Sequence, residues 1–143
     1  MGNILLKAVQ VGAEELEDDL LVARDTGIVW DKFKAGENLN GYRVCYLGAD
    51  ERVYLASNLD LSSISKSLIM TRHSAIEDED VECVLAGKIY NSGWGLTPGA
   101  RYFLTTGGQI TSTPPTSGYL HEVGTAEKTD TLFINFTRPV IRN

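Results

Sequence analysis

The sequence predicts an all-β protein, a small sandwich or barrel-like domain of about nine or ten short strands. Short apolar runs alternate with clusters of Gly, Pro, Asn and Thr, which is the pattern of strands joined by tight turns. The chain has 143 residues, 43% of them hydrophobic, which suffices for one domain with an ordinary core. It contains no internal repeat and no low-complexity tract.

Two regions are distinguished along the chain. Residues 1–34 are predicted to form an N-terminal arm that docks on a partner, and residues 35–143 to form the β domain. An apolar chain terminus usually frays unless it is docked, and the arm begins with an apolar run. The residues expected to contact a partner are Asn3, Ile4, Leu5, Leu6, Leu16 and Leu20.

One short helix is predicted within the arm, over residues 13–23. At this spacing Leu16 and Leu20 lie on one face, and acidic residues occupy the first turn, where the helix dipole favours them. A helix this short needs tertiary or partner contacts to persist. A strand through residues 20–23 is the alternative.

From Ile28 onward the pattern is that of strands and turns. The expected strands are rich in β-branched and aromatic residues, and the expected turns are rich in Gly, Asn and Asp. The longest predicted loop, residues 58–66, is polar. In order, the predicted strands are 28–30, 42–47, 52–56, 67–71, 81–86, 88–90, 101–104, 119–126 and 131–136, with turns at 36–38, 48–51 and 77–80.

Charge and hydropathy exclude several classes of partner. The 13 basic and 19 acidic residues give a net charge of −6, and no Lys/Arg cluster is present, which disfavours nucleic acid and anionic membranes. No run approaches the roughly 18 apolar residues of a membrane span. The apolar run at residues 4–9 is interrupted by Lys7 and is too short for a signal peptide, so synthesis in the cytoplasm without targeting is expected.

The two cysteines, Cys45 and Cys83, are far apart and both lie in strand-like runs. Free cysteine in such a setting behaves as a small hydrophobic residue. Small disulfide-dependent domains use more than one bridge. Buried, reduced thiols are therefore expected, with a single disulfide as the alternative.

No catalytic, cofactor-binding or metal-binding constellation is recognised, and the protein is predicted not to be an enzyme. His73 and His121 each stand alone, so a small hydrolase that uses His121 with a Ser or Thr is the remaining enzyme hypothesis. Asp78, Asp80 and Glu82 alternate and could offer oxygen atoms to Ca²⁺. They lack the glycine and the terminal glutamate of a calcium-binding loop, however, so a solvated turn is expected.

Trp30 and Trp94 are candidate interface aromatics. An exposed aromatic side chain on a β scaffold can stack on a sugar or anchor a protein interface. Burial in the core of a small sandwich is the alternative for both.

A series of short blocks between residues 35 and 141 carries a family resemblance. Pro98 and Gly99 suit a tight turn, Pro114 and Pro115 suit an extended crossover, and Gly124 permits a bulge or a close backbone approach. The blocks are residues 35–39, 42–44, 48–50, 53–58, 87–89, 94–99, 110–119, 123–126, 132–135 and 139–141. In this order they resemble the head decoration, or cement, proteins of tailed phages and related head-fibre modules.

The resemblance implies an all-β structural protein of the virion. Such a protein binds the outer surface of the major capsid protein shell and stabilises the capsid. It is expected to form a homo-oligomer, with a trimer favoured, and to use its terminal arm on the shell. The alternative implied by the same family is a head- or tail-fibre module that binds a host receptor or glycan.

Overall fold

The structure, a computed structural model, describes residues 28–142, so the predicted helix over residues 13–23 lies outside the described residues. The described chain is almost entirely β-structure, which confirms the predicted fold class. It contains eleven strands, one helical turn and one 3₁₀ turn. The elements are β1 (Val29–Ala35), β2 (Val44–Leu47), β3 (Arg52–Leu55), α2 (Leu61–Ile64), β4 (Leu68–Thr71), β5 (Asp80–Tyr90), β6 (Arg101–Leu104), η1 (Thr106–Gly108), β7 (Ile110–Thr111), β8 (Gly118–Leu120), β9 (Glu122–Lys128), β10 (Thr131–Ile134) and β11 (Val140–Arg142).

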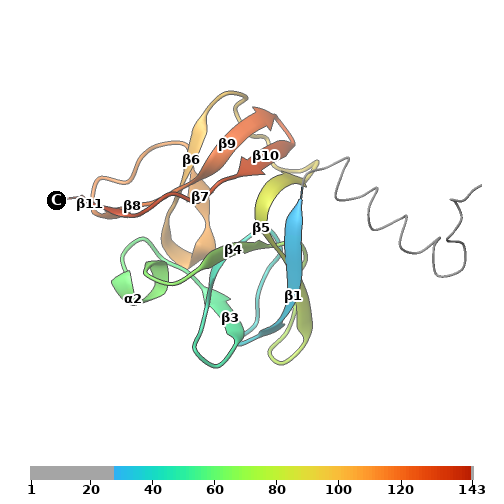
Figure 1. The fold of residues 1–143 in the computed structure, drawn as a ribbon. Coiled ribbons are helices and arrows are strands. Elements are labelled where there is room, and N and C mark those ends of the chain that lie inside the picture. The colour runs from blue at the N-terminus through green and yellow to red at the C-terminus, as the bar shows by residue number, and fades with distance from the viewer. Residues whose placement is uncertain (1–27, 143) are drawn as a thin grey trace, which may run out of the picture.

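Five strands close into a barrel in the order β1-β3-β2-β4-β5, because β1 pairs with both β3 and β5. The pairing of β1 with β3 is parallel, and the other barrel pairings are antiparallel. The predicted turn at residues 48–51 joins β2 to β3 as a hairpin, with the Gly48 N–H donating to the Arg52 carbonyl at 2.8 Å. Figure 1 shows β1, β3 and β4 on one side of the molecule and β6, β9 and β10 on the other.

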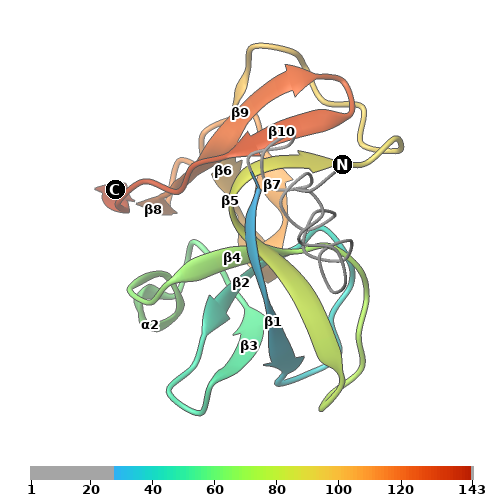
Figure 2. The same cartoon turned by 45° about the vertical axis from the view of Figure 1, so that its right-hand side comes forward.

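The second sheet is connected to the barrel through β5, which belongs to both (Figure 2). The first part of β5 pairs with β1 and β4, and its last residues pair with β10 from Gly87 to Tyr90. Gly87 has φ 105°, a conformation that costs glycine little and other residues a great deal. The second sheet continues from β5 in the order β10-β9-β6-β7, and β8 and β11 form a separate two-stranded pair.

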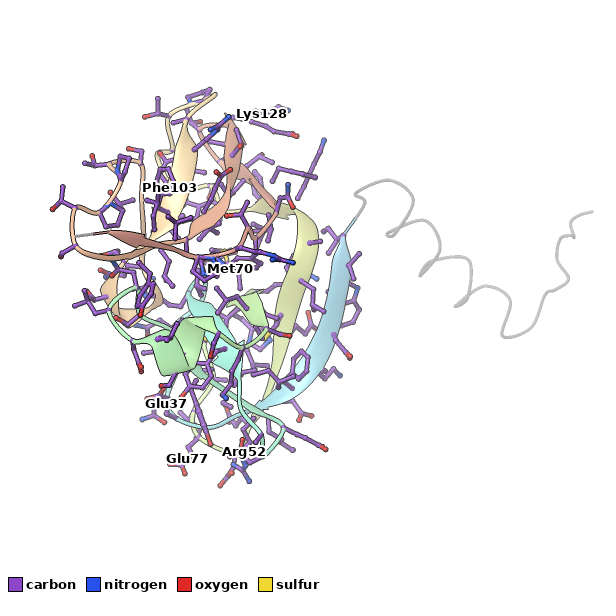
Figure 3. The ribbon with its side chains drawn as sticks, turned by 60° about the vertical axis from the view of Figure 1, so that its left-hand side comes forward. Glu37, Arg52, Met70, Glu77, Phe103 and Lys128 are labelled. Carbon is purple, nitrogen blue, oxygen red and sulfur yellow. The ribbon has the colours of Figure 1, made fainter. Side chains whose placement is uncertain are left out.

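Two hydrophobic clusters form the core. The first fills the barrel, and the second lies between the barrel wall and the second sheet. Figure 3 places Met70, a member of the second cluster, in the middle of the molecule, between Arg52 at one end and Lys128 at the other. The barrel cluster consists of Ala35, Leu39, Cys45, Val53, Ile69, Ala75, Val81 and Cys83, and the second cluster of Val44, Ala56, Leu68, Met70, Val84, Ile89, Leu96, Tyr102, Leu104, Val123, Ala126, Leu132 and Ile134.

The barrel wall facing the second sheet is buried on both sides. Successive residues of a strand point to opposite faces, so Ile69 contributes to the barrel cluster and Met70 to the second cluster. All four residues of β4 are buried for this reason. A continuous apolar run, rather than an alternating one, is the sequence pattern of such a strand.

Several boundaries differ from the sequence-based prediction, and the strand predicted at residues 119–126 is divided into β8 and β9. The predicted loop at residues 58–66 contains α2, a single helical turn whose first N–H groups are capped by Asp60, which accepts from the Ser62 N–H at 3.0 Å. Strand β1 starts at Val29, ahead of the predicted domain boundary at 34/35, because residues 29–34 pair with β5. The strands predicted at 81–86 and 88–90 are one continuous strand.

Candidate functional site

Three apolar side chains remain exposed where β1 begins. Val29 pairs with Ala86 and Trp30 with Val84, so Leu85 is an extra residue in β5, a β-bulge opposite this step. The exposed fractions of Val29, Trp30 and Leu85 are 56%, 42% and 37%. We call these three residues the β1 patch. The three residues are neighbours in the pairing of β1 with β5, and exposed apolar side chains this close together in a sheet can mark an interaction surface.

A second feature lies between the barrel and the second sheet. It is a groove of about 310 Å³, which we call the seam groove. The ring of Tyr42 meets the ring of Trp94 edge-on, with centroids 5.3 Å apart and planes at 61°. The other lining residues come from the start of β2, from the loop that follows β5, and from β6 and β7: Arg43, Gly95, Leu96, Tyr102, Gln109 and Ile110.

Tyr42 has a strained backbone, with φ 59°. The conformation is held by Thr71, which is fully buried at the end of β4. The Thr71 hydroxyl donates to the Asn40 carbonyl at 2.8 Å and accepts from the Arg43 N–H at 3.0 Å. The Thr71 carbonyl accepts from the Tyr42 N–H at 2.8 Å. One buried threonine thus fixes the loop that brings Tyr42 and Arg43 to the groove.

Tyr42 also lines a neighbouring cleft of about 490 Å³. Arg72, Lys88 and Lys128 contribute three positive charges to that cleft, and Glu127, which pairs with Lys88 at 3.2 Å, contributes one negative charge. With Arg43 of the seam groove, the two linings therefore hold four basic side chains and one acidic side chain. This local excess of positive charge contrasts with the net charge of −6 for the whole chain.

The alternating acidic residues of the barrel end are each paired with their own cation. Asp78 pairs with Arg52, Asp80 with Lys34 at 3.0 Å, and Glu82 with Arg72 at 3.7 Å. The hydrogen bond from Lys34 lowers the pKa of Asp80. No group of three or more His, Cys, Asp or Glu residues that could hold a metal occurs within residues 28–142.

His121 is buried, with 4% of its surface exposed, and its Nδ1 atom has no hydrogen-bond partner. Its ring lies edge-on to Phe136, with centroids 6.4 Å apart. Burial lowers the pKa of His121, because the charged imidazolium loses its hydration. His73 is exposed, and its Nε2 atom accepts from the Glu82 N–H at 3.1 Å.

Cys45 and Cys83 are buried in the barrel cluster as free thiols, and their predicted burial is confirmed. Burial raises the pKa of Cys45 and raises that of Cys83 to about 12. Because the thiolate is the reactive form, both side chains are held as inert thiols at neutral pH.

The predicted site residues have different positions in the structure. Trp30 belongs to the β1 patch, and Trp94 is half-buried in the seam groove, packed against the second cluster. The structure does not bring these two tryptophans into one site. The predicted arm residues Asn3, Ile4, Leu5, Leu6, Leu16 and Leu20 lie outside the described residues.

Sequence reasoning missed Tyr42, Arg43 and Gln109 as members of a site. They are far apart in the chain from Trp94 and carry no motif, and only the docking of the second sheet on the barrel brings the four together. Tyr42 directly follows Gly41 in a turn-like stretch, where positive φ values occur. This was the one local signal in the sequence.

The comparisons with known proteins assign this chain to no family. No protein-family model matches this chain, and no curated protein matches it either. Within residues 28–142, no helix has the length and apolar character needed to cross a membrane.

Proposed function

We propose that this protein is a non-enzymatic structural protein of a phage virion, which decorates and stabilises the capsid by binding the outer surface of the major capsid protein. The resemblance in the sequence is the first support. The resembling blocks from residue 110 onward contribute to the strands β7 to β11 and the turns between them. The proposed state is a homo-oligomer, with a trimer favoured.

The β1 patch is the observation that carries the proposal. It directly follows the N-terminal segment, whose apolar start suits docking on a shell. Trp30 is the residue of the patch that suits an interface hot spot, where tryptophan is enriched. In this proposal the arm and the patch both contact the capsid protein.

Binding to undecorated phage heads tests this proposal. The purified protein is first sized by light scattering and then titrated onto heads that lack it. Saturation at a fixed copy number per capsomer is expected. Deletion of residues 2–12, which precede the first described strand in the chain, should abolish binding and leave the circular dichroism spectrum of the β domain unchanged.

Substitutions in the patch separate its role from that of the arm. Trp30→Ser should weaken binding to heads at least about tenfold, since hot-spot truncations cost roughly 2 kcal/mol or more. Ile76→Ser is the matched control, because Ile76 is 60% exposed and lies outside the patch. Equal loss for both variants would contradict the role of the patch. No binding of the unaltered protein to heads would contradict the proposed function and favour the fibre module.

A further inference from the structure

The seam groove has the composition of a binding site for a polar ligand that has a ring with an apolar face. Ligand sites combine aromatic walls with a few convergent polar groups, and here Trp94 and Tyr42 supply the wall. Arg43 and Gln109 supply polar groups that line the same groove.

The polar groups of the groove have unused hydrogen-bonding capacity. The side chain of Arg43 makes one hydrogen bond among the described residues, from Nη1 to the Gly41 carbonyl at 3.5 Å, the upper limit for such a bond. The side-chain amide of Gln109 makes none among the described residues, and Gln109 is exposed. The guanidinium of arginine matches a carboxylate in shape and charge, with two parallel N–H donors.

The groove is also preorganised. The Thr71 hydroxyl holds the loop before β2, and Tyr42 keeps a left-handed backbone conformation that most residues avoid. Strained residues of this kind are found preferentially at binding sites, where the fixed geometry lowers the entropy cost of binding.

Charge selects among ligands that have a ring with an apolar face. Four basic side chains and one acidic side chain line the groove and the adjoining cleft. Arg72 and Lys88 are paired with Glu82 and Glu127, so among the described residues Arg43 and Lys128 are the charges that favour an anion locally. The chain as a whole is acidic, at −6, which disfavours the dense charge of a nucleic acid. A sugar carrying a carboxylate has an apolar ring face, hydroxyl groups and a single charge, and so satisfies each of these conditions.

We propose that the seam groove binds a carboxylated sugar unit of a saccharide, with the sugar ring against Trp94 and its carboxylate on Arg43. Gln109 pairs with ring hydroxyl groups. The neighbouring Lys128 favours a carboxylate on an adjacent unit of the same chain. The site is separate from the β1 patch and does not depend on capsid binding.

A fluorescence titration tests the site. Trp30→Phe leaves Trp94 as the only tryptophan of the chain, so the emission reports on the groove. The probes are sialyllactose and a galacturonate oligomer, with lactose as the neutral counterpart and an oligodeoxythymidine as the nucleic-acid competitor. The acidic sugars should shift the emission saturably, and lactose should bind at least about tenfold more weakly, as expected for the loss of a charged hydrogen bond.

Variants in the Trp30→Phe background assign the contact. Arg43→Gln should raise the Kd for the acidic sugars about tenfold or more, and Gln109→Ala should raise it severalfold, with thermal unfolding unchanged. Arg101→Gln is the matched control, because Arg101 is exposed on β6 outside the groove. Equal weakening by Arg43→Gln and Arg101→Gln, equal binding of lactose, or tighter binding of the oligodeoxythymidine would each overturn the proposal. So would the absence of any shift with both acidic sugars.

Discussion

At the scale of single residues, Thr71 shows how one buried hydroxyl positions a surface loop. Its Oγ1 atom contacts the backbone of both Asn40 and Arg43, which flank Tyr42 in the chain. A buried polar group is stabilising only while it is hydrogen-bonded, and this one serves as donor and acceptor at once. The strained conformation of Tyr42 therefore depends on a residue 29 positions further along the chain.

Thr71→Val is expected to lower the free energy of unfolding by about 1–3 kcal/mol, because it keeps the volume and removes the partner of the part-buried Asn40 carbonyl and Arg43 N–H. Urea denaturation measures the change. Thr111→Val is the control. The Thr111 hydroxyl accepts a hydrogen bond from the exposed Thr113 N–H, and in the variant water can replace it as the acceptor. A loss for Thr71→Val no larger than for Thr111→Val would show that the network does not hold the loop.

At the scale of elements, the close packing of β9 on β10 depends on a residue without a side chain. Gly124 pairs with Ile134, and a Cβ atom at Gly124 would overlap the carbonyl oxygen of Phe133. The backbone conformation at Gly124 is ordinary, so the requirement is for space. The predicted close backbone approach at this glycine is confirmed.

Gly124→Ala should therefore destabilise the protein by about 1–3 kcal/mol, the usual cost of overpacking. Thermal unfolding followed by circular dichroism provides the measurement. Gly93→Ala is the matched control, because the nearest atom to a Cβ there is an Asn91 oxygen at 3.7 Å, an ordinary contact. If both variants unfold at the same temperature as the wild type, the strands are not in close contact at Gly124.

Strand β5 links the two halves of the molecule. Its first part closes the barrel, and its last part starts the second sheet. Because the same strand lies in both sheets, the barrel wall and the second sheet enclose one cluster that neither could bury alone. The seam groove is lined by residues from both halves, so its geometry depends on how the second sheet is docked on the barrel.

At the scale of the whole molecule, the buried His121 links stability to pH. Its pKa is lowered by burial in the folded state, while the unfolded chain keeps the ordinary value of about 6.5. Between these two values the unfolded state binds more protons than the folded state. Stability is therefore full above about pH 6.5 and is lost as the pH falls toward the folded-state pKa.

The free energy of unfolding should accordingly be lower at pH 5.5 than at pH 7.5. Carboxylates remain ionised over this range, so they do not contribute to the difference. Urea denaturation at both pH values measures the difference. In His121→Gln the difference should shrink, because the titrating group is gone. His73→Gln is the control and should retain it, since His73 is exposed. An unchanged pH difference in His121→Gln would contradict the assignment.

Local patterns in the sequence were sufficient for much of the fold. The all-β class, the hairpin turn at residues 48–51 and the acidic turn at residues 77–80 follow from residue types that act over a few positions. The burial of Cys45 and Cys83 followed from their strand-like surroundings. The helical turn α2 was missed because one capped turn is too short to produce a periodic pattern.

Only the tertiary structure decided which strands pair. The closure of the barrel joins Val29 to Ala86, and the second sheet brings Trp94 to Tyr42. Such contacts join distant parts of the chain, and the pattern of an individual strand does not specify its neighbour. The sequence by itself thus determined the all-β class, the position of most strands and the burial of the two cysteines, because these depend on residue types over a few positions, while the barrel, the β1 patch and the seam groove arose from long-range pairing.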